Sequence, residues 1–423
     1  MNELYGLFKK NSFDNHYVSA AKMLNSAYAT KYTSNTMKKI EKYCSHGANM
    51  LIKDGICYSS FIRNLTEYND NELSPSLELL LGIFRLERVL SDDFDPEKDV
   101  DRVVIGKIGA ELFGEKVTCC PKGNAMAFIG DELYFCCSFR CENGRYKSFR
   151  LVYDTVKKAL VKPALIKIKY RGNLYDMDDE LINRIYEDNG CARAKEGVVE
   201  MVSMWDEYKG EYYSTFVIGS STPNNGILIK TRDFETAELV SVIPYNENGS
   251  AEAISHIFDG QIFVACRQQW TLPYMLLMRY DIDKGEWKPP YRIEDANSRP
   301  NMFVYKGDLY LYNTIDEGFR KYSNISKIRT SKKAHNGKNN PIDTIATLYD
   351  CGAYDGFCVY GDRIFFIGSK DSCVCFGELK IKEYSPTFVQ QRLLELFGEC
   401  DNVDCANLKD GDNDIAIGAQ RDS

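Results

Sequence analysis

The stretch YKGDLYLYNT, residues 305–314, has the form of two strands joined by a tight turn. An aromatic residue precedes the turn at Lys306 and Gly307, and Leu and Tyr dominate the run that follows. Five similar phrases occur in the chain: IKDGICYSSF from Ile52, FIGDELYFCC from Phe128, EYKGEYYSTF from Glu207, IFDGQIFVAC from Ile257 and VYGDRIFFIG from Val359. Six occurrences of one strand–turn–strand phrase indicate a repeated β-unit.

The spacing of the turn glycines indicates the size of each unit. They are Gly55, Gly130, Gly210, Gly260, Gly307 and Gly361. The last three intervals, of 50, 47 and 54 residues, each fit one four-stranded unit, and the first two, of 75 and 80 residues, fit a unit with a long insertion. Six hairpin-linked units predict an all-β, six-bladed β-propeller, because radial repetition leaves few open sheet edges. A β-sandwich is the alternative, but it would not require this regular phrase.

The same spacing predicts how the chain is divided. We expect the propeller at residues 46–384, with innermost strands near residues 47–52, 124–129, 200–206, 252–258, 299–305 and 354–360. Residues 1–45 form an N-terminal extension, and one role open to it is to add an outer strand to the last blade and close the ring. Residues 385–398 have the pattern of an amphipathic helix, with Ser385 as N-cap and Gly398 after the last turn. Residues 399–423 are rich in Asp and Asn, which predicts a disordered acidic tail.

The composition is that of a soluble globular protein rich in β-structure. Apolar residues make up 44% of the 423 residues and aromatic residues 13%, and the net charge is −8. This charge argues against a nucleic-acid partner, because the phosphate backbone requires a basic surface. The sequence has no signal-peptide pattern and no run long enough to cross a membrane, so we expect a cytoplasmic protein with its 15 cysteines reduced. It also predicts no metal and no cofactor, and nothing in it indicates an oligomeric state.

Candidate functional residues are found by counting from the turn glycines. In a propeller each innermost strand begins at one end of the central channel, and the second strand returns to that end. Counting back places Glu252 and Arg299 at this end, each eight residues before its glycine. Tyr354 and Asp355 lie there too, seven and six residues before Gly361. The count therefore predicts that charged side chains and a tyrosine gather at one mouth of the channel.

Counting forward from the glycines reaches the same mouth. Arg267 is seven residues after its glycine and Arg63 is eight, and Arg320 lies just beyond the second strand of the fifth blade. Arginine binds carboxylates with two parallel hydrogen bonds and stays charged, so such a cluster favours an acidic ligand. A tyrosine becomes a nucleophile when a nearby carboxylate takes its proton. Trp270 is a candidate for stacking against a sugar ring, and His256 is a second candidate proton carrier.

One segment resembles the sialidase superfamily of propellers. NGSAEAISHIFDGQIFVACRQ, residues 248–268, is similar to the sialidase segment in which a glutamate opens one strand and an arginine closes the next. By this resemblance Glu252 would activate a tyrosine nucleophile and Arg267 would hold the substrate carboxylate. GAYDGFCVYGDRIFF, residues 352–366, places Tyr354 where the nucleophile of the family stands. Arg320 is then the partner of Arg267, with Arg299 as its competitor.

Other positions resemble the family less closely. YDIDKGEW, residues 280–287, is similar to the Asp-box turn of the family, with Asp283, Gly285 and Trp287 in its characteristic places. The family's F-R-I-P signature is absent, because the first inner strand has SHGANML at residues 45–51. Asp70 is the nearest candidate by location for the acid/base aspartate.

Three functions agree with these residues. The first is a glycoside hydrolase that acts on an acidic sugar with Tyr354 and Glu252. The second is a lyase that acts on a uronic acid polymer, in which an arginine neutralises the carboxylate. The third is a propeller without catalysis that recognises a glycan or a protein loop through the same residues.

Overall fold

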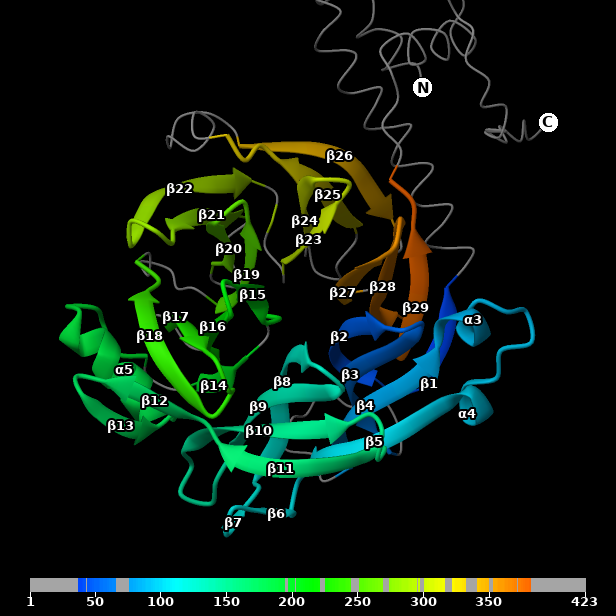
Figure 1. Cartoon of the computed structure of the whole chain (residues 1–423), viewed down its shortest axis with the longest axis horizontal. Helices are drawn as coiled ribbons and strands as arrows, with labels where there is room; N and C mark the ends of the chain where they lie inside the picture. Colours follow the sequence, from blue (N-terminus) through cyan, green and yellow to red (C-terminus); the bar gives the residue numbers. More distant parts are fainter. Residues whose placement is uncertain are drawn as a thin grey trace, which may run out of the picture.

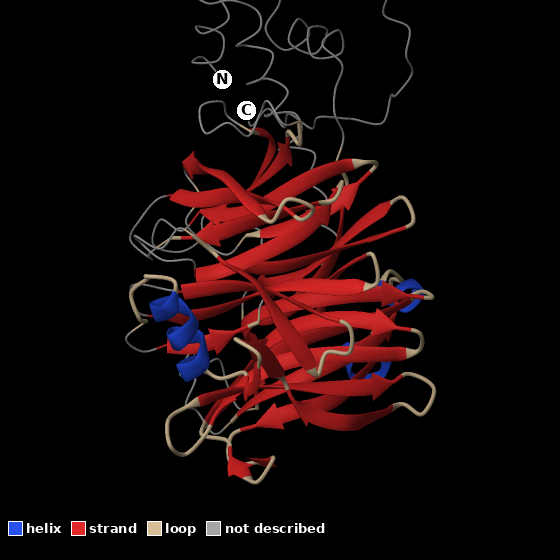
Figure 2. Cartoon of the chain, turned by 60° about the vertical axis from the view of Figure 1, so that its left-hand side comes forward, coloured by secondary structure: helices blue, strands red, loops and turns tan. Residues whose placement is uncertain are grey.

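The computed structural model is a ring of six sheets around a central axis, antiparallel except for one parallel pair in blade three, which confirms the predicted six-bladed β-propeller (Figure 1). Seen from the side, strands fill the ring and the few helices lie at its edge (Figure 2). The structure describes residues 37–42, 44–65, 76–194, 197–201, 203–220, 225–244, 251–268, 274–294, 296, 300–315, 322–331, 341–349, 353–370 and 372–381. None of the helices in these ranges is long and apolar enough to cross a membrane.

Within the described residues, five blades are four-stranded sheets whose strands follow one another outward from the axis. Blade one is β2 (Cys44–Lys53), β3 (Ile56–Asn64), β4 (Leu77–Arg85) and β5 (Val100–Lys107), and blade two is β8 (Cys119–Ile129), β9 (Glu132–Arg140), β10 (Tyr146–Asp154) and β11 (Ala159–Leu165). Blade four is β19 (Ala251–Phe258), β20 (Gln261–Arg267), β21 (Tyr274–Asp281) and β22 (Glu286–Glu294), and blade five is β23 (Asn301–Tyr305), β24 (Asp308–Ile315), β25 (Tyr322–Ile328) and β26 (Ile342–Tyr349). Blade six is β27 (Ala353–Tyr360), β28 (Arg363–Lys370), β29 (Cys373–Leu379) and β1 (Lys38–Lys42).

Blade three differs from the predicted four-stranded sheet. Its expected inner strand at residues 200–206 is broken into β14 (Gly197–Glu200) and β15 (Asp206–Tyr208), because Met201 and Trp205 turn into the core between them. Outside β16 (Glu211–Ser220), β17 (Asn225–Thr231) and β18 (Thr236–Val242), the sheet is extended by a hairpin of β12 (Lys167–Tyr170) and β13 (Asn173–Asp176). β12 pairs in parallel with β18. This hairpin and α5 (Asp179–Asp188) account for the long interval before Gly210.

The other long interval holds two short helices and a hairpin. The helices α3 (Leu86–Val89) and α4 (Pro96–Asp99) lie between β4 and β5, and the hairpin of β6 (Glu111–Leu112) and β7 (Glu115–Lys116) precedes blade two. Asp95 begins α4, because its carboxylate accepts the N–H of Glu97 at 3.1 Å. These insertions add surface at the rim without changing the four-stranded sheet of blade one.

Two kinds of tight turn join the first two strands of the blades. Gly130 and Gly361 come first in their turns, with φ of 55° and 63°, and this is the type II′ arrangement. In the other four blades the glycine comes second and the residue before it also has positive φ, which is the type I′ arrangement, at Asp54, Lys209, Asp259 and Lys306. Both types match the right-handed twist of the strands, so each turn sets the register of its hairpin.

Apolar side chains between neighbouring blades form the core. The described residues contain six buried clusters, one for each interface between adjacent blades. Between the sixth and first blades, the rings of Phe84 and Phe376 meet edge to face with centroids 5.6 Å apart. Cys57 and Cys266 are buried thiols in two of these clusters. The ring is thus held together by burial of apolar surface at its interfaces.

The ring is closed by β1, which is the outermost strand of blade six and pairs antiparallel with β29 (Figure 1). Glu41 of β1 is buried and accepts from Arg102 of β5 at 2.5 Å, and Arg63 of β3 lies 3.6 Å away. Arg102 also donates to the carbonyls of Val100 and Pro96. This ion-pair network therefore binds the last blade to the first.

The remaining parts of the predicted domain division lie outside the described residues. These are residues 1–36 of the N-terminal extension, the helix at 385–398 and the acidic tail at 399–423. They stay predictions, as do the boundaries of the propeller at residues 46 and 384.

We predict that Glu41→Gln destabilises the ring. The substitution removes the charge that Arg102 and Arg63 share, and both guanidinium groups are largely covered by the protein. The expected loss is about 3 kcal/mol in the free energy of unfolding, the lower end of the cost of breaking a buried ion pair. Urea denaturation measures it. Glu87→Gln is the matched control, because Glu87 is 76% exposed and lies 3.8 Å from Arg85, so its loss should be under about 0.5 kcal/mol. Equal losses in the two variants would contradict the role of Glu41.

Candidate functional site

Four innermost strands carry a one-residue bulge at the same place. In β19, Ala251 pairs with Arg267 and Ile254 pairs with Ala265, so two residues of β19 oppose one residue of β20. The same offset occurs in β27, β2 and β8. The bulged residues are 47–48, 123–124, 252–253 and 354–355. We call the end of the ring where these bulges lie the bulge face, and a bulge there redirects the side chains that it carries.

Glu252 and Tyr354 lie at different distances from the turn glycines of their blades, and the two types of turn explain this difference. Counted from the glycine, Glu252 is eight residues before the turn and Tyr354 is seven. Counted from the last residue of the strand, the two distances are equal: Glu252 is six residues before Phe258, and Tyr354 is six residues before Tyr360. Glu252 and Tyr354 therefore hold the same position in blades four and six, the first residue of the bulge.

The backbone of Glu252 is strained. Its φ is 47°, in the left-handed region that residues with a side chain rarely adopt. Gly123 holds the same bulge position in blade two with a φ of 97°, so this position favours glycine. A side chain there costs roughly 1–3 kcal/mol, and such strain is concentrated at functional sites.

Glu252 and Arg267 form an ion pair. Arg267 Nη1 donates to Glu252 Oε2 at 3.0 Å, and the exposed fractions of the two side chains are 2% and 13%. The structure thus brings together the two residues that the sequence placed at one end of the strands. The pair is charge-assisted and almost dry, so it is strong and fixes the direction of the carboxylate.

His256 follows Glu252 on the same strand and is bonded to the third blade. Its Nδ1 lies 3.0 Å from Asp206 Oδ2, and the same carboxylate accepts the N–H of Ile257 at 2.9 Å. Burial opposes protonation of the imidazole, but the charge and hydrogen bond of Asp206 outweigh it and raise the pKa of His256. The sequence analysis did not identify Asp206. The signal that could have found it is its position four residues before Gly210, the same as that of His256 before Gly260.

Arg63 lies elsewhere in the fold. It donates to Glu78 at 3.0 Å and lies near Glu41, within the network that closes the ring. It is one residue further along its strand than the position of Arg267, so it faces the opposite side of its sheet. The structure therefore does not bring Arg63 into the cluster with Arg267.

The other predicted residues are described in part or not at all. Tyr354 and Asp355 lie in β27, where the strand is described but these two side chains are not. Arg299, Arg320, Trp270 and Asp70 lie outside the described residues. Their roles, and a bond between Tyr354 and Glu252, stay predictions.

The proposed Asp-box turn is held by a different carboxylate from the expected one. Asp281 accepts the N–H of Lys284 at 3.2 Å, whereas Asp283 is exposed and contacts Lys209. The same kind of turn also occurs in two other blades, where Asp154 and Asp233 each accept two backbone N–H groups. The sequence analysis found only one of the three, since it searched for the complete motif.

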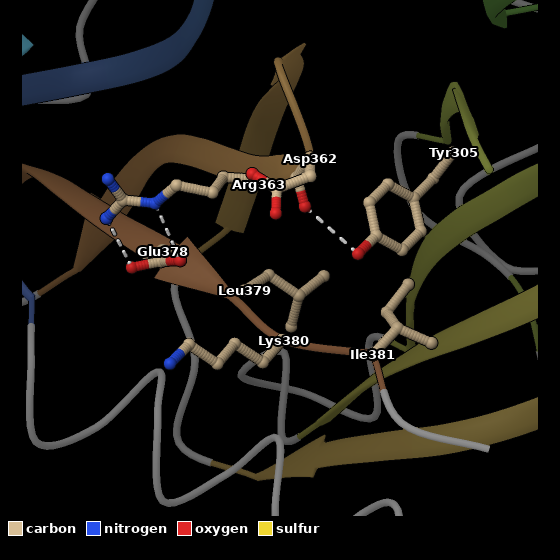
Figure 3. Close-up of a pocket in the computed structure, with 7 residues that line it drawn as sticks. All are labelled: Tyr305, Asp362, Arg363, Glu378, Leu379, Lys380 and Ile381. Carbon is tan, nitrogen blue, oxygen red and sulfur yellow. Dashed lines mark hydrogen bonds and ion pairs between the residues drawn. The ribbon is translucent and has the colours of Figure 1, made fainter.

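A hollow of about 470 Å³ opens at the opposite end of the ring, between blades five and six (Figure 3). Some of its polar groups are bonded to one another: Tyr305 donates to the carbonyl of Asp362 at 3.1 Å, and Arg363 makes two bonds to Glu378 at 3.0 and 2.7 Å. Lys380 and the carboxylate of Asp362 also line the hollow. The residues that line it include none of those that the sequence analysis selected, so the bulge face is the candidate site.

Known structures share this architecture. Trypanosoma rangeli sialidase with the inhibitor DANA matches with a TM-score of 0.52 and 10% identity, over 84% of this chain and 57% of that chain. The fold is that of the sialidase propellers. The same sialidase with 2,3-difluorosialic acid, described as a covalent intermediate, gives a TM-score of 0.51, 9% identity and coverage of 86% and 59%. This chain spans less than two thirds of the length of these trypanosomal chains.

Two bacterial proteins also share the sialidase-like fold. A mutant of NanB sialidase from Streptococcus pneumoniae gives a TM-score of 0.51 and 11% identity, over 83% of this chain and 72% of that chain. A Dyadobacter fermentans protein of unknown function gives a TM-score of 0.52 and 10% identity, over 82% and 100%. No protein-family model and no curated protein matches the sequence. At such low identity these likenesses show the fold and not the chemistry.

We predict that Glu252 and Arg267 are energetically coupled. Glu252→Gln leaves the buried guanidinium without its carboxylate and should cost about 3 kcal/mol in the free energy of unfolding. Adding Arg267→Met should cost less than the sum of the two single changes, which a double-mutant cycle in urea measures. Glu286→Gln in the same blade is the control, since Glu286 is exposed and contacts Lys288 at the surface. Simple additivity of the two changes would show that the ion pair contributes nothing.

Proposed function

We propose that the chain binds an acidic sugar of the sialic acid class at the bulge face and hydrolyses its glycosidic bond. The observation that carries this proposal is the dry ion pair of Glu252 and Arg267 at a strained bulge of a sialidase-like ring. The sialidases that share the fold are described in complex with sialic acid or its analogues, which supports the same ligand class here. Arg267, with Arg299 and Arg320, would hold the carboxylate of the sugar.

The chemistry follows from the positions of two residues. Arg267 bonds to Oε2 of Glu252, so Oε1 is the oxygen that would take the phenolic proton of Tyr354. The phenolate then attacks the anomeric carbon: a carbon–oxygen bond forms to Tyr354, and the bond to the leaving oxygen breaks as that oxygen takes a proton from an acid, for which Asp70 is the candidate. In a second step water attacks the same carbon and gives its proton back to this acid, while the tyrosine oxygen leaves and regains its proton from Glu252. The two displacements together retain the configuration of the sugar.

A second function, binding without hydrolysis, is favoured by the same ion pair. Glu252 already has a strong partner in Arg267, and a carboxylate that serves only to orient an arginine supports recognition rather than proton transfer. Both functions need the same ligand class, and they differ in whether Tyr354 reacts.

We predict that Tyr354→Phe abolishes turnover of an activated sialoside and leaves binding of sialic acid nearly unchanged, because only the nucleophilic oxygen is lost. Intact-mass measurement with 2,3-difluorosialic acid should detect a covalent adduct in the unmodified protein and none in the variant. Glu252→Gln should lower the rate about 10²–10⁴-fold through loss of the base. Tyr360→Phe is the control, since Tyr360 lies at the other end of β27. Full activity of Tyr354→Phe would exclude this nucleophile, and binding without turnover in the unmodified protein would select the second function.

We also predict that Arg299→Met and Arg320→Met weaken the binding of sialic acid. Loss of one charge-assisted contact to the ligand carboxylate should cost about 1.5–3 kcal/mol of binding free energy. Isothermal titration calorimetry measures the change. Arg329→Met is the control, because Arg329 is bonded to Asp343 near the end of β25. An unchanged affinity for both test variants would remove the arginine cluster from the site.

A further inference from the structure

The innermost strand β19 pairs with β20 on one edge, and side chains of the third blade contact its other edge. These contacts fall on alternate residues of β19, as the hydrogen bonds of a partner strand would. We call Ser203, Asp206 and Thr215 the edge clamp. Its bonds run from Thr215 Oγ1 to the Ala253 carbonyl at 2.5 Å, from the Ser255 N–H to Ser203 Oγ at 2.8 Å, and from the Ile257 N–H to Asp206 Oδ2 at 2.9 Å.

The break in the inner strand of blade three makes the edge clamp possible. Between β14 and β15 the chain leaves the strand conformation, and Ser203 lies in this break with no exposed surface. Its hydroxyl also lies 3.0 Å from the hydroxyl of Ser255. Asp206 is the first residue of β15, directly after the break. An unbroken strand would direct alternate side chains to opposite faces of the sheet. The break therefore allows Ser203 and Asp206 to reach the same edge of β19.

The edge clamp reaches the bulge that carries Glu252. Thr215 bonds to the carbonyl of Ala253, the second residue of that bulge. The ladder with β20 is interrupted at these two residues, and the bond from Thr215 and the ion pair with Arg267 hold them instead. A strained backbone conformation persists only where the contacts around it hold it in place. The direction of the Glu252 carboxylate therefore depends on contacts from blade three as well as on Arg267 of blade four.

One bond of the edge clamp involves a titratable pair. Asp206 accepts the Ile257 N–H and also lies against His256, and this carboxylate raises the pKa of the imidazole against the opposing effect of burial. A raised pKa in the folded state means that protonated His256 stabilises the fold. This stability is fully present below the unfolded pKa of about 6.5 and is lost as pH rises through the folded pKa.

The other groups near His256 do not compete for Asp206. β20 places Phe263 opposite His256, and the charges at the far end of these strands, Glu252 and Arg267, are bonded to each other. The titratable side chains of the other strands packed on β19 have other contacts. In β15 Glu207 accepts the N–H of Gly210, and Lys209 lies over the ring of Tyr208. In β16 Tyr212 donates to the carbonyl of Phe128, and Tyr213 donates to Glu211, which pairs with Lys230 of β17. In β23 Tyr305 donates to the carbonyl of Asp362.

We propose that the edge clamp positions Glu252 and that the His256–Asp206 ion pair makes this positioning dependent on pH. Asp206 and His256 are positioning residues, since they act on the site through β19. The expected effect on ligand binding rests on the proposed function, in which the bulge face binds an acidic sugar. Binding there should be tightest while His256 is protonated and should weaken as the pH rises.

Hydrogen–deuterium exchange tests the clamp without any ligand. Protection of β19 amides, taken relative to unstructured rates so that the intrinsic effect of pH cancels, should fall as pH rises in the unmodified protein. It should be low and independent of pH in His256→Gln, and Asp206→Asn should shift the fall to lower pH. Thr231→Val is the control, because Thr231 is a buried threonine of the same blade that bonds within its own turn. The same pH dependence in His256→Gln as in the unmodified protein would overturn the clamp.

Sialic acid binding tests the positioning. The affinity of the unmodified protein should fall over the same pH range as the β19 protection, and Thr215→Val should weaken binding at every pH, because it removes the bond beside Glu252. An affinity that stays unchanged in Thr215→Val and His256→Gln, with β19 protection lost, would overturn the positioning role. If the unmodified protein binds no sialic acid, the proposed function fails, and the exchange experiment still decides whether the clamp exists.

Discussion

The two-residue turn after each innermost strand is the constraint on which the rest of the structure depends. Positive φ is required at one or both turn positions, and in every blade one of these positions is a glycine. Each turn fixes which residues of the first two strands face each other, and so which side chains enter each interface between blades. The bulge lies at the same distance from the end of the strand in blades four and six, so Glu252 and Tyr354 hold one position in two blades.

At the bulge, strain and polar contacts balance each other. Glu252 holds a backbone conformation that glycine holds in blade two, and its carboxylate is bonded to a buried guanidinium. Contacts from the third blade hold the neighbouring Ala253 and the strand beyond it. Because an unpaired buried charge costs more than the strain, the ion pair keeps the strained conformation in place.

The fold could be predicted from the sequence because its signal is local. A turn glycine between two apolar runs is visible in ten residues, and six such phrases give the number of blades. Contacts between distant segments give no such signal. The bond of Glu41 to Arg102 and the contact of Asp206 with His256 join residues far apart in the chain. The pairing of β12 with β18 could not be foreseen either, because β12 precedes the inner strands of its own blade.

The candidate site was predictable in part for the same reason. Glu252 and Arg267 flank one hairpin, so counting along the sequence placed them at one end. Arg63 was placed beside them because the count from the glycine disregarded that a shift of one residue reverses the face of a strand. Blades one and four have the same type of turn, so the counts of eight and seven residues after the glycine can be compared directly, and they place Arg63 and Arg267 on opposite faces. The turn type is needed only to compare Glu252 with Tyr354.

The closure of the ring by β1 has a consequence for the order of events during synthesis. Of the described strands, β1 emerges from the ribosome first, and its partner β29 emerges last. Until β29 is made, the backbone of β1 has no strand to pair with, and only contacts with blade one, such as that of Glu41 with Arg102, are open to it. Contacts between such distant segments form slowly, and unpaired strand edges associate with other chains. The nascent protein must therefore keep its first strand from pairing elsewhere until its last strand is made.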